Sequence, residues 1–266
     1  MTLIQATVLG AVQGATEFLP ISSTAHLVIV PWFMGWEDPG STFDIALHLG
    51  TLIALLLYFR AEWFRLASGG LKLLTGKTKD PDAKLAGFII VATIPAGIAG
   101  LLLDKYADEH LRKPPLIAVM LILLAFGLLL AERAAKQVTT INNISLTDAL
   151  SVGFAQALAL IPGVSRSGVT ITAGLFRGLT REAAARFSFF LSTPIIGAAV
   201  ALKMLHLFRH GLSGGDALPW LAGVVVSGVM GYLAIAFMLR YLATHSTFLF
   251  IYYRIALGIL ILGLIR

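Results

Sequence analysis

The sequence predicts an all-α polytopic membrane protein with six spanning helices and two re-entrant helix–loop–helix segments that meet near the membrane midplane. Three observations lead to this fold class. Hydrophobic residues make up 58% of the 266 residues and charged residues only 13%, about half the roughly 25% of soluble domains. Six apolar segments approach the length of a membrane span. Two polar islands rich in Gly, Pro and Ser interrupt otherwise apolar sequence.

The expected spans each lie near the ~20 apolar residues that cross a bilayer. They are residues 43–58, 85–103, 115–131, 187–205, 218–239 and 248–265. Charged residues gather in the expected loops, which are residues 60–84, 104–113, 132–148, 177–186 and 209–216. Because the chain has no cysteine, disulfides and thiolate metal sites are excluded.

The two islands are expected to enter and leave the membrane by the same face. Residues 1–34 form an apolar stretch interrupted at Pro20, and proline breaks a helix and pushes the preceding residue out of the α region. The arm after Pro20 has about 12 residues, or roughly 18 Å at 1.5 Å per residue, which is too short to cross. Residues 147–177 repeat this design at Pro162 and Gly163.

The islands also resemble each other in sequence. Gly10 and Gln13 match Gly153 and Gln156, and residues 19–24 match residues 161–167 with one inserted residue. Each island precedes three expected spans, and because three is odd, the second half begins on the opposite face. Broken helices from both faces then meet near the midplane. We therefore expect a single membrane domain over residues 1–266, built as an inverted-topology repeat of residues 1–140 and 141–266.

Positive charge indicates the orientation of this domain. Lys and Arg are more frequent in the loops expected on one face, above all in residues 60–84, than in those of the other face. The positive-inside rule makes the first face cytoplasmic, so both termini and the first island are expected on the outer side. These loops also account for the formal charge of +6. No basic-aromatic nucleic-acid motif is present, so no nucleic-acid partner is expected.

The first island holds groups suited to phosphate chemistry. Gln13 and Glu17 are four residues apart and hence lie on one helix face, and His26 lies one turn into the next half-helix. The hydroxyl residues at the bend can cap that half-helix, whose N-terminus attracts anions; they are Ser22, Ser23 and Thr24. The carboxylate can serve a cation or a proton, and the imidazole can act as acid, base or nucleophile. Alternatively, Glu17 hydrogen-bonds a neighbouring helix and His26 lies at the interface.

The second island places Arg166 at a bend between Ser165 and Ser167, followed by Gly168. A guanidinium with no carboxylate in its own loop is a bidentate partner for phosphate, and the flanking residues suit an oxyanion cradle. The alternative is an ion pair between Arg166 and Glu17 across the midplane in the resting state.

A further pair of polar residues lies at the outer end of the first expected span. Asp44 and His48 are again four residues apart. They are expected to orient or line the site, with a plain interfacial pair as the alternative.

These motifs resemble the bacterial undecaprenyl pyrophosphate phosphatase family of the bacitracin-resistance type. The runs that carry the resemblance are residues 17–26, 162–168 and 186–194, together with Asp44-x-x-x-His48-x-Gly50-Thr51. It covers essentially the whole chain. The resemblance implies hydrolysis of undecaprenyl pyrophosphate to the monophosphate, which recycles the lipid carrier for cell-wall synthesis. It also implies Mg²⁺ or Ca²⁺ and an active site that opens to the outer face of the bacterial inner membrane.

The family's functional residues fall on specific positions here. Its acidic motif falls on Gln13 and Glu17, and because the first position is Gln, Glu17 is the principal acid. Its catalytic Ser and His fall on Ser23 and His26, and either can be the nucleophile. Its phosphate-binding Arg falls on Arg166.

Other classes fit less well or stay as alternatives. The acid-phosphatase-like lipid phosphatases are excluded, because no PSGH motif precedes Arg166 and no His follows nearby. A prenyl-phosphate transporter or flippase is the alternative function, because inverted repeats of broken helices also build secondary carriers. A homodimer is compatible with the sequence.

Overall fold

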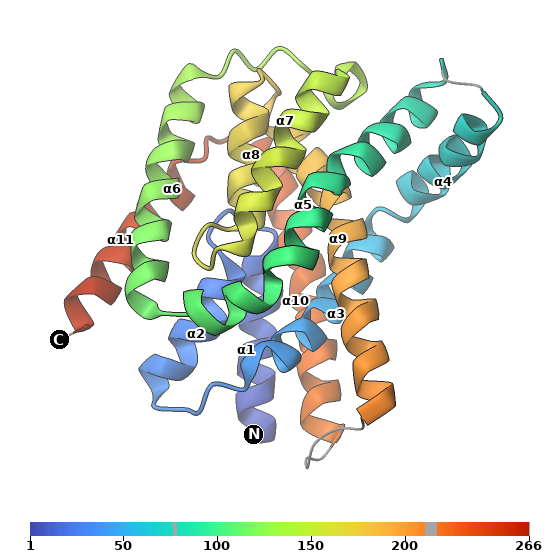
Figure 1. Cartoon of the computed structure of the whole chain (residues 1–266). Helices are drawn as coiled ribbons and strands as arrows, with labels where there is room; N and C mark the ends of the chain where they lie inside the picture. Colours follow the sequence, from blue (N-terminus) through green and yellow to red (C-terminus); the bar gives the residue numbers. More distant parts are fainter. Residues whose placement is uncertain (77–78, 211–216, 266) are drawn as a thin grey trace.

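The computed structural model describes residues 1–76, 79–210 and 217–265, so most of the expected loop at residues 209–216 lies outside it. In chain order the α-helices are α1 (Leu3–Glu17), α2 (Ser23–Met34), α3 (Gly40–Tyr58), α4 (Arg60–Leu74), α5 (Pro81–Leu111), α6 (Pro114–Ala134), α7 (Leu146–Ala157), α8 (Arg166–Phe176), α9 (Arg181–His210), α10 (Ala217–Leu242) and α11 (Phe248–Leu264). Two short 3₁₀ turns, η1 (Ile141–Asn143) and η2 (Leu158–Leu160), complete the described elements. The predicted all-α class is therefore confirmed (Figure 1).

Five described helices are long and apolar enough to cross a membrane, as expected for a polytopic membrane protein. They are α3, residues Pro81–Leu103 of α5, α6, residues Arg181–Lys203 of α9, and α10. The sixth expected span, residues 248–265, forms the 17-residue helix α11. At 1.5 Å per residue it is roughly 25 Å long, shorter than the other five.

Two segments expected as loops are helical instead. Residues 60–84 contain α4, and residues 104–111 continue α5 beyond its apolar part. The charged side chains in these segments are exposed or half-buried wherever the structure describes them. In α4, Leu66 and Gly69 are buried whereas Arg65 is exposed, so the segment is an amphipathic helix and not a linker.

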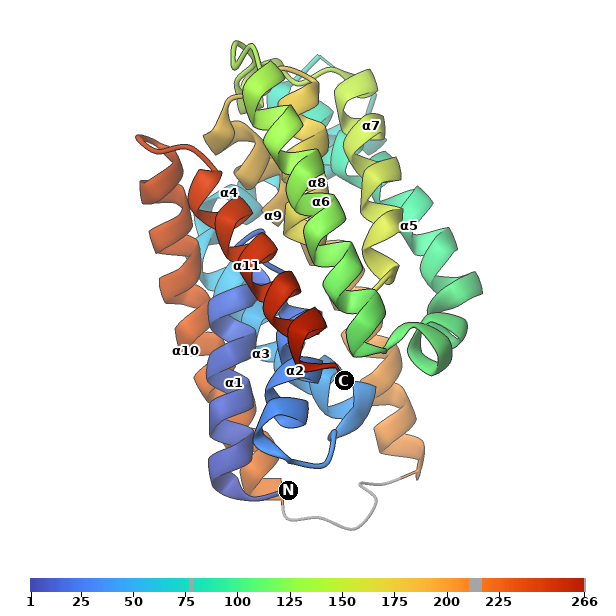
Figure 2. The ribbon, with the colours of Figure 1, turned by 90° about the vertical axis from the view of Figure 1, so that its left-hand side faces the viewer.

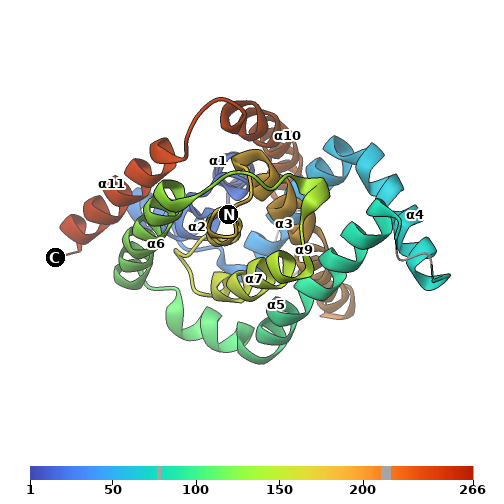
Figure 3. The same ribbon diagram turned by 90° about the horizontal axis from the view of Figure 1, so that it is seen from above.

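The two short helix pairs turn back inside the bundle. The α1–α2 pair comes from the end of the molecule that holds the N-terminus, and the α7–α8 pair comes from the opposite end (Figure 2). Their turns meet where the hydroxyl of Ser167 donates to the carbonyl oxygen of Leu19 over 2.8 Å. Helices α5, α6 and α9 pack around the α7–α8 pair (Figure 3).

Glycines let the short helices touch the long ones backbone to backbone. A Cβ atom on Gly10 would lie 2.4 Å from the carbonyl oxygen of Gly223, so α1 is in direct contact with α10. A Cβ atom on Gly153 would lie 2.3 Å from the carbonyl oxygen of Ala92, so α7 contacts α5 in the same way. Small residues at such crossings are typical of membrane helices. This packing fixes the height at which each turn sits.

Candidate active site

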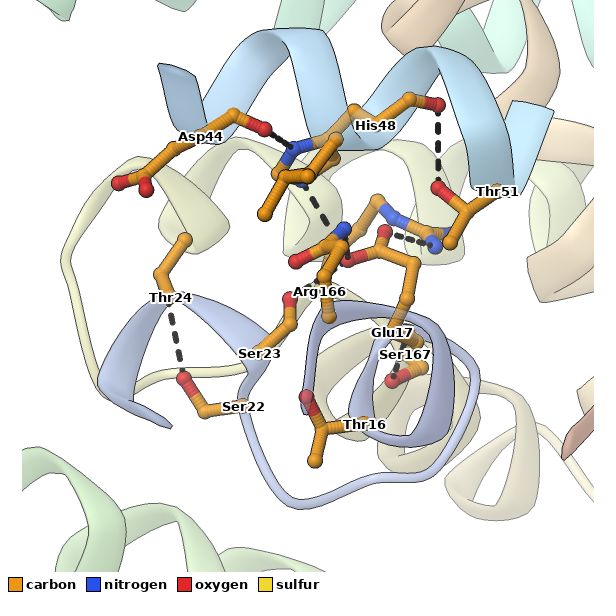
Figure 4. A network of polar contacts seen from close by, with 12 residues as sticks. Thr16, Glu17, Ser22, Ser23, Thr24, Asp44, His48, Thr51, Arg166 and Ser167 are labelled. Atoms are coloured by element: carbon orange, nitrogen blue, oxygen red, sulfur yellow. Dashed lines mark hydrogen bonds and ion pairs between the residues drawn. The ribbon is translucent and has the colours of Figure 1, made fainter. Parts of the chain in front are cut away.

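The carboxylate of Glu17 is the centre of the polar network between the two turns (Figure 4). Glu17 ends α1 and is only 5% exposed. Its Oε2 accepts hydrogen bonds from the hydroxyl of Ser23 at 2.5 Å and from the amide of Gln13 at 3.1 Å. The same oxygen lies 3.4 Å from Nε2 of His48. Its Oε1 pairs with the guanidinium of Arg166 at 2.9 Å. The i, i+4 contact between Gln13 and Glu17 and the cross-turn ion pair are both present as anticipated.

Each turn contains a serine with an unusual backbone. Ser22 has φ of 74° and Ser165 has φ of 70°, a region that non-glycine residues rarely adopt. Each serine caps the following helix, since its hydroxyl accepts from the amide of Ala25 or Gly168, respectively. Such a conformation costs of order 1–3 kcal/mol and persists where the surrounding structure enforces it. The turns thus share one backbone geometry.

The residues directly after these two serines point to the same carboxylate. Ser23 follows Ser22 and Arg166 follows Ser165, and both contact Glu17. Arg166 also donates to the carbonyl oxygen of Ser188 over 3.2 Å, which holds its side chain against α9. The equivalent positions of the two turns therefore supply a hydroxyl and a guanidinium to one site.

The remaining residues of the predicted cradle hold the turns in place. The hydroxyl of Ser167 contacts the backbone of the first turn at Leu19, and it lies 3.3 Å from the hydroxyl of Ser165. Thr24 lies 3.2 Å from the hydroxyl of Ser22. A Cβ atom on Gly168 would approach Arg254 to 2.8 Å, so this glycine makes room for a buried guanidinium behind α8.

His26 faces away from Glu17. Its Nδ1 lies 2.7 Å from the carbonyl oxygen of Ser22 and its Nε2 lies 2.6 Å from the hydroxyl of Tyr253. Because a carbonyl oxygen only accepts, Nδ1 carries the hydrogen, and Nε2 of a neutral ring accepts from Tyr253. No hydrogen bond joins His26 to Ser23 among the described residues. A catalytic role for His26 therefore stays a prediction that requires the ring to turn.

His48 is closer to the centre than the sequence suggested. Its Nδ1 lies 2.7 Å from the carbonyl oxygen of Asp44, so this nitrogen is the donor, and a hydrogen bond from Nε2 to Glu17 requires the imidazolium form. The carboxylate of Asp44 pairs with Arg112 at 2.8 Å, and Arg112 also binds Asp38. Asp44 thus anchors the start of α3, from which His48 reaches the site.

Arg254 is the residue that sequence reasoning missed. It is only 1% exposed, and it donates to the carbonyl oxygens of Pro20, Gly163 and Val164 at 2.9–3.0 Å. It also donates to Leu121 on α6 at 3.1 Å. One guanidinium is therefore hydrogen-bonded to both turns. The available signal was a lone arginine in the apolar segment 248–265, because charge inside a membrane is rarely without a role.

The donor set partly fits the divalent cation that the resemblance implies. Among the described residues, no group of three or more His, Asp or Glu side chains is placed to hold a metal. However, Oε1 of Gln13 is buried without a hydrogen-bond partner beside Glu17. Mg²⁺ is often held by one or two carboxylates together with substrate phosphate oxygens. Glu17 and Gln13 therefore fit as half of a site that a substrate would complete.

Fold and polar centre together define a multi-pass membrane protein with a buried ionic site between two broken helices. Residues 6–260 match the family model of the bacitracin resistance protein BacA, and the chain belongs to this family. It is 49% identical to a protein of Moorella thermoacetica over 263 residues, 99% of this chain and 98% of that protein. It is 47% identical to a protein of Trichlorobacter lovleyi, covering 100% of this chain and 98% of the relative. Both relatives are named undecaprenyl-diphosphatase. The resemblance found in the sequence is thus confirmed.

Proposed function

We propose that this protein is an integral membrane undecaprenyl-diphosphatase, which hydrolyses undecaprenyl pyrophosphate to undecaprenyl phosphate and inorganic phosphate. The family match and the names of relatives over their full length support this activity. This reaction recycles the lipid carrier of cell-wall synthesis and gives bacitracin resistance. The single observation that carries the proposal is that Ser23 and Arg166 converge on the buried carboxylate of Glu17.

Arg166 is the group proposed to bind the pyrophosphate. In the described state its charge is neutralised by Glu17 at 2.9 Å. A phosphate oxygen competes for the same guanidinium, which forms bidentate contacts with phosphate as readily as with carboxylate. The N-terminal ends of α2 and α8 meet at this point and favour an anion. Substrate binding therefore exchanges one anionic partner of Arg166 for another.

Ser23 is the proposed nucleophile, and Glu17 is its base. The hydroxyl oxygen of Ser23 attacks the terminal phosphorus, its proton passes to Oε2 of Glu17, and the bond to the bridging oxygen breaks. Undecaprenyl phosphate leaves, and water then hydrolyses the phosphoserine to inorganic phosphate. The 2.5 Å contact supports this assignment. The competing assignment to His26 requires Nε2 to leave Tyr253.

The proposal includes a divalent cation, Mg²⁺ or Ca²⁺, with Glu17 as its carboxylate ligand and Gln13 as a carbonyl ligand. When bound, such an ion neutralises charge on the phosphate oxygens. Oε2 of Glu17 would keep its contact with Ser23. The buried Oε1 of Gln13 has no hydrogen-bond partner, and this supports Gln13 as the second protein ligand of the ion.

We further propose an inverted-topology repeat in the bacterial inner membrane, with α11 as the sixth span and α1–α2 and α7–α8 as re-entrant pairs. The shared geometry of Ser22 and Ser165 and the opposite approach of the two pairs support this arrangement (Figure 2). The excess of Lys and Arg in residues 60–84 supports placing both termini and the site toward the outer face.

The decisive experiment measures phosphate release from a prenyl pyrophosphate by purified protein in detergent, with and without Mg²⁺. Glu17→Ala and Arg166→Ala are each expected to lower the rate by at least about 100-fold, because each removes a group that acts on the phosphate. Arg240→Ala, an exposed position on α10, is the matched control and should leave the rate unchanged. Release that survives both site substitutions would contradict the assignment, and lipid translocation without phosphate release would favour the carrier alternative.

A further inference from the structure

Helix α4 projects from the bundle instead of packing inside it (Figures 1 and 3). It follows the span α3 after the single residue Phe59, and it packs on the start of α5. Leu66 is buried on that side. A Cβ atom on Gly69 would lie 2.5 Å from the carbonyl carbon of Asp82, so the two backbones touch. Only one face of α4 is therefore covered by protein.

The opposite face of α4 carries an exposed apolar stripe. Phe64 is 78% exposed, Leu71 67% and Leu74 84%. These residues are spaced by seven and three positions, so they lie on one side of the helix. Water does not stably cover a contiguous row of large apolar side chains. Because α4 continues directly from a membrane span, the nearest apolar cover is the bilayer itself.

Two exposed arginines give this surface a positive charge, with Arg60 on the side of the stripe and Arg65 on the flank of the helix. Arg60 and Arg65 are exposed, and neither forms an ion pair within the described part of the chain, whereas the neighbouring Lys72 pairs with Asp80 at 2.6 Å. Glu62 is already engaged by Arg186. Acidic residues are outnumbered in the segment 60–84, whose basic residues are Arg60, Arg65, Lys72, Lys77, Lys79 and Lys84 against Glu62, Asp80 and Asp82. The surface therefore suits an anionic partner.

The bend between α3 and α4 carries a hollow of about 280 Å³, which is a shallow depression open to the surface and not an enclosed cavity. Its lining residues are Leu56, Arg60, Trp63, Phe64 and Ala67. Aromatic residues and arginine at the end of a span are typical of the layer where lipid headgroups meet acyl chains. The hollow thus combines apolar walls with one guanidinium, that of Arg60.

We propose that α4 is an interfacial amphipathic helix and that the hollow at the α3–α4 bend binds an anionic phospholipid of the surrounding leaflet. The apolar stripe enters the acyl boundary, and Arg60 with Arg65 contacts lipid phosphate. None of these residues contacts Glu17, Ser23 or Arg166. The lipid site is therefore independent of the hydrolase proposal and can fail without it.

Native mass spectrometry of the full-length protein tests this site, with phosphatidylglycerol and phosphatidylcholine of equal chain length as probes. The wild type is expected to hold phosphatidylglycerol more tightly, by about fivefold for each arginine near the headgroups. The double variant Arg60→Gln/Arg65→Gln should lose this preference. The control is Lys105→Gln/Lys113→Gln, which removes one exposed lysine near the C-terminal end of α5 and one in the connection between α5 and α6. This variant should keep the preference for phosphatidylglycerol.

An unchanged preference for phosphatidylglycerol in the arginine variant would overturn the proposal. Detection of a dimer without bound lipid would also overturn it, because a second copy of the protein would then cover the apolar stripe.

Tryptophan fluorescence gives an independent measure of lipid binding at the hollow. The difference between wild type and Trp63→Phe isolates the signal of Trp63 without changing the other three tryptophans. Brominated phosphatidylglycerol should quench that signal more than brominated phosphatidylcholine. Equal quenching by both lipids contradicts the assignment.

Discussion

The hydroxyl of Ser23 is hydrogen-bonded to the carboxylate of Glu17 over 2.5 Å, across a turn that contains Pro20 and places the two residues six positions apart in the chain. The contact prepares Ser23 for proton transfer. Ser23→Ala is therefore expected to lower phosphate release by at least about 100-fold while leaving the fold intact. Ser151→Ala is the control, because Ser151 only donates to the carbonyl oxygen of Thr147 in its own helix.

Trapping of a phosphorylated intermediate distinguishes the two possible nucleophiles. If Ser23 attacks, the phosphorylated protein survives acid treatment and Ser23→Ala abolishes it. An acid-labile phosphoryl group that persists in Ser23→Ala would instead assign the attack to His26.

Removal of the Tyr253 hydroxyl tests whether His26 takes part in proton transfer. Tyr253→Phe breaks the 2.6 Å contact with Nε2 of His26 and keeps the ring stacking. We expect a loss of about 1 kcal/mol in stability and less than about a tenfold loss of phosphate release, which is well below the effect of a missing acid or base. Thermal unfolding and the release assay measure the two effects separately. A loss beyond about 100-fold would show that the His26–Tyr253 pair acts on the substrate.

Substitution of Arg254 by lysine keeps the charge but removes the planar set of donors. A lysine cannot reach Pro20, Gly163 and Val164 together. Buried carbonyl oxygens are then left unpaired, and the expected loss of stability is about 3 kcal/mol. Phosphate release should fall as well, because the two turns are no longer held together. Arg240→Lys provides the matched control on an exposed surface, and wild-type behaviour of Arg254→Lys would show that charge alone matters.

Gly14 sets the distance between α1 and α10. A Cβ atom there would lie 2.4 Å from the carbonyl oxygen of Ser227, so Gly14→Ala forces the two helices apart. The substitution also displaces Glu17, which lies about one helical turn after Gly14. The expected loss of stability is about 1–3 kcal/mol. Gly97→Ala has no atom within 4 Å of the new methyl group and should be neutral or stabilising by about 0.5–1 kcal/mol. Thermal unfolding of both variants gives the comparison.

Much of the site could be predicted because its signals are local. A proline next to a carboxylate in an apolar stretch is visible without a fold, and so is an arginine between two serines. The contact between Glu17 and Arg166 could be anticipated as one of two alternatives, because the sequence predicts that both polar islands meet near the membrane midplane. Membrane helices were found by length and composition, which is the most reliable signal in such chains.

The features that sequence reasoning missed depend on side-chain direction and on distant partners. The direction of the His26 ring depends on its hydrogen bond with Tyr253, which lies 227 residues later in the chain. No local sequence pattern predicts that pairing. Arg254 donates to backbone carbonyl oxygens. Every residue type has such an oxygen, so the sequence does not reveal these partners. The charges of residues 60–84 favour a loop only when their helical spacing is left out. The buried positions of α4, Leu66 and Gly69, lie three residues apart and mark the covered face of an amphipathic helix.

The position of Arg254 in the chain has a consequence for assembly of the membrane protein. Its carbonyl partners belong to residues 20, 121, 163 and 164, all of which emerge from the ribosome before α11. During synthesis both turns therefore lack the hydrogen bonds from Arg254 until α11 has been inserted. The polar centre is completed only once α11 has been made, so a nascent chain that stalls before this helix carries every residue of the Glu17 network and still lacks the guanidinium that joins the two turns.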